Sequence, residues 1–172
     1  MNIQKYFKPS TSKNTIWNIA KTLFQTALFW GFFLLFLPDM IMYVETIVGF
    51  PLFKKSPNIG IITFVFFSIL GLWSGITMSV LGRGTPLPTD CPNELVVKGP
   101  YRFVRNPLAV AGIGQGMSIG LYFGSPFVII YALLGAVMWH YLVRPEEEFN
   151  LEQRFGNVYL EYKNRVKCWL PF

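Results

Sequence analysis

The sequence predicts an all-α integral membrane protein with about four transmembrane helices and a C-terminal amphipathic helix on the cytoplasmic side. Of its 172 residues, 52% are hydrophobic and only 14% are charged. This composition is too apolar for an ordinary soluble domain. Three stretches with few or no charges cover residues 16–37, 59–81 and 108–143. A spanning helix needs about 20 apolar residues, and a Gly-Ser-Pro turn at 124–126 divides the third stretch, so we expect two spans there.

The predicted N-terminal half, residues 1–81, contains the first two spans. Between them, residues 39–50 combine Asp39 and Glu45 with apolar side chains. This segment is too short to cross a bilayer, so we expect a helix lying along the interface.

The predicted C-terminal half, residues 82–172, is expected to hold the catalytic chemistry. It divides into a loop at 82–107, a helical hairpin at 108–143 and a helix at 145–166. The loop is rich in glycine and proline and cannot form a regular helix. Long structured loops of this kind are often functional.

Basic residues gather before the first predicted span, between the second and third, and after the fourth. Only Lys54 and Lys55 fall on the opposite side. The positive-inside rule therefore predicts that both termini and the active site lie on the cytoplasmic side. Topogenesis and attraction to anionic membrane lipid account for the net charge of +6, so no nucleic-acid partner is expected. The two cysteines belong to no metal-ligand pattern, and no metal site is expected.

Two charged segments lie next to apolar stretches, where charge is costly and therefore marks a functional site. The first, residues 99–107, supplies Tyr101, Arg105 and Asn106 just before a membrane helix. The second begins at Arg144, and helical spacing from there predicts one stripe that faces the bundle. The stripe comprises Arg144, Glu148, Leu151, Phe155, Val158 or Tyr159, Tyr162 and Val166.

The first turn of this stripe has two interpretations. Pro145 followed by Glu146 and Glu147 is a conventional helix start, in which carboxylates complement the helix dipole. Arg144 and Glu148 are spaced for an ion pair on the buried side. An arginine held there is able to grip a substrate carboxylate with two hydrogen bonds.

The segments GTPLP at 84–88, ELVVKGPYRFVRNPLAV at 94–110 and EEEFNLEQRFGNVYLEYKNRV at 146–166, with the closing LPF, resemble the isoprenylcysteine carboxyl methyltransferase and phospholipid methyltransferase family. The resemblance implies an integral membrane enzyme that uses S-adenosylmethionine as cofactor and methylates a lipophilic or lipidated substrate. Carried over by position, it implies a cofactor site of Glu94, Leu95, Val96, Tyr101, Arg105, Asn106, Pro107 and Ala109. It also implies that Arg144, Glu147 and Glu148 are catalytic residues that address the substrate.

Two positions depart from the family pattern. Asn106 stands where the family usually has histidine, and Ala109 where it often has an aromatic residue. Asparagine replaces a histidine that forms hydrogen bonds, but not one that accepts a proton. Cofactor binding is therefore expected to survive the change better than a role as a base.

Methyl transfer from a sulfonium is a single in-line displacement, so it depends on positioning and exclusion of water. A carboxylate acceptor is already ionised at neutral pH and needs only an orienting cation such as Arg144. An amine must lose a proton, for which Glu147 or Glu148 is the nearby candidate. We expect a carboxylate. The alternatives are an NADPH-dependent membrane reductase, because sterol-reductase-like proteins are similar in the same region, and a non-catalytic membrane scaffold.

Overall fold

The computed structural model describes residues 7–12 and 14–170, and within these ranges the chain is helical with no named strand. The expected all-α fold is therefore confirmed. The last two residues of the closing LPF motif lie outside the described residues.

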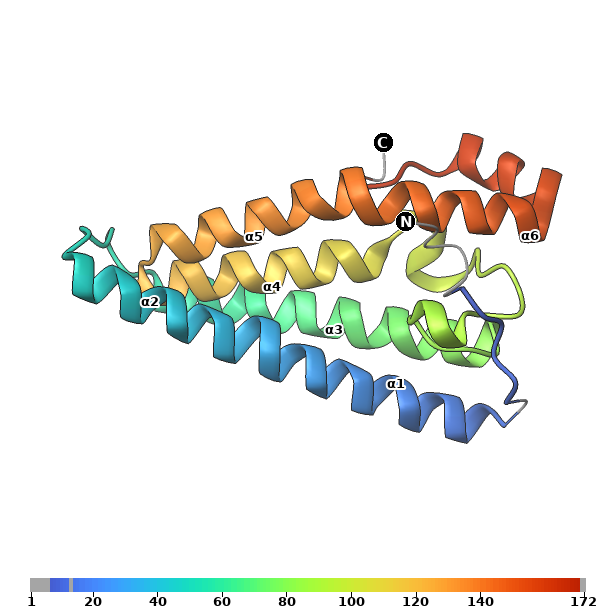
Figure 1. Cartoon of the computed structure of the whole chain (residues 1–172), viewed down its shortest axis with the longest axis horizontal. Helices are drawn as coiled ribbons and strands as arrows, with labels where there is room; N and C mark the ends of the chain where they lie inside the picture. The colour runs from blue at the N-terminus through green and yellow to red at the C-terminus, as the bar shows by residue number, and fades with distance from the viewer. Residues whose placement is uncertain (1–6, 13, 171–172) are drawn as a thin grey trace.

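The first helix is longer than the sequence predicted. It runs without interruption through α1 (Thr15–Phe29), the π-helical η2 (Trp30–Phe36) and α2 (Leu37–Val48), as Figure 1 shows. The separate short helix expected at 39–50 is not found. Pro38 stands at the start of α2, directly after the π-helical turns, and such turns accommodate the interrupted hydrogen bonding around a proline.

Glu45 lies within this apolar helix, where a carboxyl side chain needs a hydrogen-bond partner. Its side chain is buried, and its Oε1 accepts the backbone N–H of Phe127 at 2.8 Å. That N–H lies in the first turn of α5, where helices leave backbone donors without partners. The carboxylate thus joins α2 to α5.

The remaining membrane helices are α3 (Pro57–Leu81), α4 (Pro107–Phe123) and α5 (Pro126–Met138). α5 continues through the π-helical η5 (Trp139–Val143) into α6 (Arg144–Arg165). Among the described residues, three continuous helices are long and apolar enough to cross a membrane: Thr15–Val48, Pro57–Leu81 and Pro126–Arg165. α4, with 17 residues, packs between α3 and α5 but is shorter than these. The structure therefore does not confirm the expected count of four.

The apolar part of the stripe on α6 faces the protein, as predicted. Tyr159, Tyr162 and Val166 form a small core, and Leu95 and Val97 of the loop pack against it. Gly156 kinks the helix with a φ of 51°. The predicted stripe contained either Val158 or Tyr159. Tyr159 is buried at 1% exposure, whereas Val158 is 64% exposed.

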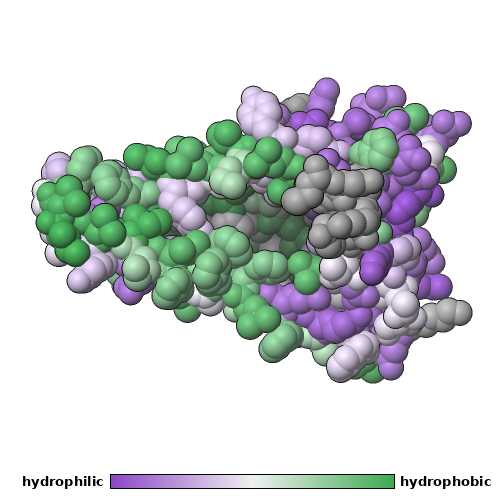
Figure 2. All heavy atoms as spheres, viewed as in Figure 1, coloured by the Kyte–Doolittle hydropathy of each residue, from purple (hydrophilic) through white to green (hydrophobic). Residues whose placement is uncertain are grey.

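Polar and apolar residues divide the molecule along its length. Figure 1 places the start of α1, the loop between α3 and α4, and α6 at one end, with the turns at 49–56 and 124–125 at the other. Hydrophilic residues gather at the first end and hydrophobic ones cover the rest (Figure 2). The two charged segments, residues 99–107 and the start of α6, therefore meet at one end of the bundle.

Candidate active site

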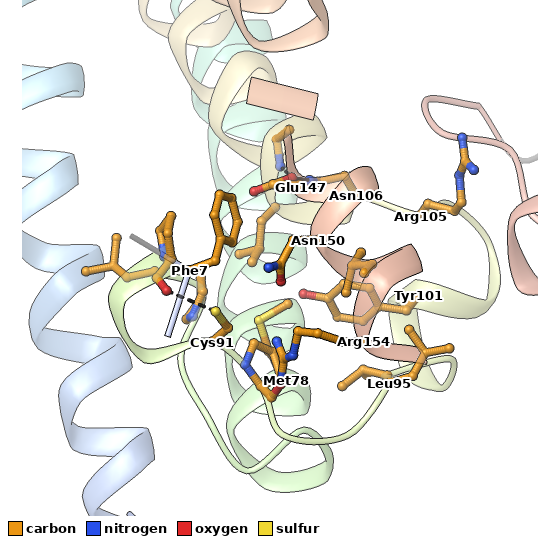
Figure 3. A pocket seen from close by; sticks show the side chains of 18 of the residues that line it. Phe7, Met78, Cys91, Leu95, Tyr101, Arg105, Asn106, Glu147, Asn150 and Arg154 are labelled. Atoms are coloured by element: carbon orange, nitrogen blue, oxygen red, sulfur yellow. Dashed lines mark hydrogen bonds between the residues drawn. The ribbon is translucent and has the colours of Figure 1, made fainter. Parts of the chain in front are cut away.

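A cavity of about 210 Å³ lies at the polar end, between the loop and α6 (Figure 3). The loop carries two short 3₁₀ turns, η3 (Pro88–Asp90) and η4 (Gly99–Arg102), and α6 supplies the opposite wall. The lining comprises Phe7, Met78, Pro86, Leu87, Pro88, Cys91, Pro92, Glu94, Leu95, Val96, Tyr101, Arg105, Asn106, Leu108, Ala109, Trp139, Glu147, Asn150, Leu151, Arg154 and Tyr162.

Asn106 connects the two charged segments. Its Oδ1 accepts the backbone N–H of Ala109 at 3.0 Å and so caps the N-terminus of α4. Its Nδ2 donates to Oε2 of Glu147 at 3.0 Å. One amide therefore fixes the start of a membrane helix and orients a carboxyl group of α6 at the cavity.

Tyr101 brings a buried hydroxyl to the cavity. The Tyr101 hydroxyl is buried without a partner among the described residues, while the backbone carbonyl of Tyr101 accepts the Tyr162 hydroxyl at 2.7 Å. Burial raises the pKa of the Tyr101 hydroxyl well above its usual value. This hydroxyl is therefore protonated at neutral pH and able to donate to a ligand.

Arg105 borders the cavity, but its guanidinium group points away from the other labelled cavity residues (Figure 3). Its Nη2 lies 3.0 Å from Oε1 of Glu148, and its side chain is only 10% exposed. Its Nε and Nη1 are buried without a partner within the described part of the chain. Buried donors are normally hydrogen-bonded, and these atoms lie on the side of the ion cluster and the Cys168 thiol rather than in the cavity.

Glu148 is the centre of an ion cluster beside the cavity. Besides Arg105, its carboxylate contacts Arg144 Nε at 2.8 Å and Lys163 Nζ at 2.9 Å. The predicted pair of Arg144 and Glu148 is thus present. Arg144 Nη1 also lies 3.2 Å from Nδ1 of His140.

The structure brings most of the predicted site residues together. Eight of them line the cavity: Glu94, Leu95, Val96, Tyr101, Arg105, Asn106, Ala109 and Glu147. Pro107 is buried as the first residue of α4 and is not in the lining. Arg144 and Glu148 are also outside the lining, because they share the face of α6 that points into the ion cluster.

Sequence reasoning missed several lining residues. Asn150 and Arg154 follow Glu147 at helical spacing, so extending that face of α6 would have found them. Arg154 donates from Nη2 to the backbone carbonyl of Pro92 and thereby joins α6 to the loop. Phe7 belongs to a segment without any periodic pattern, and no signal in the sequence identified it.

Comparison with known proteins agrees with this arrangement. A family model described as phospholipid methyltransferase matches residues 59–158. Protein-S-isoprenylcysteine O-methyltransferase B of Arabidopsis thaliana is 27% identical over 143 residues, which cover 78% of this chain and 70% of the relative. Protein-S-isoprenylcysteine O-methyltransferase of Xenopus laevis is 32% identical over 82 residues, covering 46% of this chain and 28% of the relative. The chain belongs to the phospholipid methyltransferase family and is a multi-pass membrane methyltransferase.

Proposed function

We propose that this protein transfers a methyl group from S-adenosylmethionine to the carboxylate of a lipophilic substrate of the isoprenylcysteine type. The observation that carries the proposal is the cavity in which Tyr101, Asn106 and Glu147 converge from two charged segments (Figure 3). The names of the two relatives favour this acceptor over an amine.

The lining fits a donor that carries both an anion and cationic groups. Arg154 lines the cavity, and its guanidinium group is suited to the donor's carboxylate, because guanidinium groups bind carboxylates through charge-assisted hydrogen bonds. Glu147 faces the cavity and is suited to a group of positive charge. The Tyr101 hydroxyl supplies a further donor. S-adenosylmethionine supplies an electrophilic methyl group on its sulfonium.

A carboxylate acceptor requires no proton transfer. A carboxylate oxygen forms a bond to the methyl carbon while the bond from that carbon to sulfur breaks, and sulfur keeps the electron pair. Since the carboxylate is ionised at neutral pH, the chain needs to bind, orient and exclude water rather than act as a base. We therefore assign Glu147, held by Asn106, a positioning role toward the donor. Glu148 holds Arg105 from outside the cavity, and Arg144 pairs with the same carboxylate.

We also propose that the cavity opens at the cytoplasmic face of the membrane. Lys8, Arg83, Lys98 and Arg102 belong to segments at the polar end of the bundle, whereas Lys54 and Lys55 belong to the turn at the far end. The positive-inside rule then orients the polar end toward the cytoplasm. The division into a 1–81 half and an 82–172 catalytic half stays a prediction, and the lining residues Phe7 and Met78 come from the first half.

The test is donor binding and product analysis with the full chain in detergent. Saturable binding of S-adenosylmethionine and its demethylated product is expected, followed by transfer of labelled methyl to N-acetyl-S-farnesylcysteine as a base-labile ester. The matched control is the same compound already esterified, which should accept nothing. Folded protein that binds no donor, or that is stabilised by NADPH instead, would overturn the proposal. Labelling of phosphatidylethanolamine as a base-stable product would overturn the carboxylate acceptor.

A further inference from the structure

The N-terminal segment, residues 7–10, lies against the cavity loop in a short parallel pairing. The backbone N–H of Lys8 donates to the carbonyl of Pro88 at 2.8 Å, and the N–H of Cys91 donates to the carbonyl of Lys8 at 2.8 Å. The N–H of Ser10 donates to the carbonyl of Cys91 at 2.9 Å. The side chain of Asn93 adds a bond from Nδ2 to the Ser10 carbonyl at 2.8 Å. These bonds hold residues 7–10 beside the loop, although this segment is far in sequence from the other residues of the site.

This pairing brings Phe7 into the lining of the cavity. Figure 3 shows Phe7 and Cys91 on one side of the cavity, and Tyr101 and Arg105 on the other. The loop residues that pair with the segment, from Pro88 to Pro92, contribute three apolar lining residues near Phe7. The cavity thus has a largely apolar wall opposite its hydrogen-bonding wall.

We propose that Phe7 is a donor-contact residue that forms the wall for the flat heteroaromatic base of S-adenosylmethionine. This inference rests on the proposed donor. Aromatic side chains bind flat rings through large apolar contact and offset or edge-to-face stacking. With the donor's charged groups directed to Glu147 and Arg154, its ring system remains for the apolar wall. Phe7 lies outside residues 59–158 that the family model matches, so that match does not supply this contact.

Substitution of Phe7 tests the contact directly. Phe7→Ala is expected to raise the dissociation constant for S-adenosylhomocysteine roughly tenfold, because it removes most of an apolar side chain from the binding site. Phe7→Leu should give a smaller increase, since it keeps apolar area but loses the ring. The matched control is Phe103→Ala, which removes an aromatic side chain that is 50% exposed and outside the lining.

A second variant tests whether the hydrogen bonds that hold residues 7–10 against the loop position Phe7 at the cavity. Asn93 lies outside the lining, and Asn93→Asp removes the donor to the carbonyls of Ser10 and Arg83 while keeping the size of the side chain. It is expected to raise the donor dissociation constant severalfold and leave the KM for the acceptor unchanged. A general loss of structure would change both constants and the melting temperature without ligand.

The outcomes distinguish this inference from the proposed function. If the unaltered protein binds no donor, the proposed function fails. If it binds donor and both Phe7 variants bind within twofold of it, the Phe7 contact is wrong while the proposed function stands. Equal losses in Phe7→Ala and Phe103→Ala would also overturn the inference.

Discussion

Replacing Glu148 by glutamine should destabilise the protein strongly, although the change is nearly isosteric. Glu148 contacts Arg105 at 3.0 Å, and the two side chains are only 15% and 10% exposed. Removing one partner of a buried ion pair costs about 3–5 kcal/mol, because the other charge stays buried without compensation. The contacts to Arg144 and Lys163 involve side chains that are 25% and 33% exposed, so each contributes about 0–1 kcal/mol.

Glutamine retains one oxygen acceptor, so we expect the lower end of this range, about 3 kcal/mol. For a chain of this size, each kcal/mol lowers the melting temperature by about 2–4 °C. Thermal unfolding in detergent should therefore show a decrease of about 6–12 °C. The matched control is Glu152→Gln on the exposed side of the same helix. Adding Arg105→Gln should recover part of the lost stability, since no buried charge then remains unpaired.

Equal melting temperatures for Glu148→Gln and Glu152→Gln would refute the reasoning. Such a result would mean that Arg105 is not held by Glu148 in solution. The same result would remove the argument that the ion cluster positions Arg105 at the cavity.

Two further predictions concern α4. Asn106→Ser keeps an N-cap residue, but the shorter side chain cannot reach Glu147. The value of kcat/KM should therefore fall at least tenfold while the melting temperature changes little. An unchanged kcat/KM would show that the bond to Glu147 has no role. Gly114→Ala places a Cβ 2.5 Å from the Phe67 ring and should destabilise by about 1–3 kcal/mol. Gly112→Ala meets nothing within 4 Å and should be neutral, and equal melting temperatures for the two alanine variants would contradict the packing.

The apolar pattern predicted the helices well but misplaced their ends. The sequence predicted a span ending at residue 37 and a separate interfacial helix at 39–50, because Asp39 and Glu45 stand in a segment too short to cross a bilayer. In the structure π-helical turns precede Pro38, and Glu45 is buried as an acceptor for α5. The burial of Glu45 depends on a partner helix, and the accommodation of Pro38 depends on local widening of the helix. Neither feature is visible in the periodicity of one segment.

The cavity was predictable only in part. The charged blocks identified Tyr101, Arg105, Asn106 and Glu147, because each stands beside an apolar stretch. Phe7 enters through backbone hydrogen bonds to the loop, and such bonds carry no signature of side-chain type. Long-range backbone pairing therefore limits what sequence patterns reveal about this site.

Two adjacent glutamates of α6 have separate surroundings, which follow from helical geometry. Neighbouring residues on a helix point about 100° apart, so Glu147 faces the cavity while Glu148 faces the ion cluster. Glu147 accepts from the neutral amide of Asn106, whereas Glu148 contacts three cations. A carboxylate surrounded by cations is fixed in place and has its charge compensated. The sequence pattern offered both as equal candidates to address a ligand, and the difference between their partners makes Glu147 the residue suited to that role.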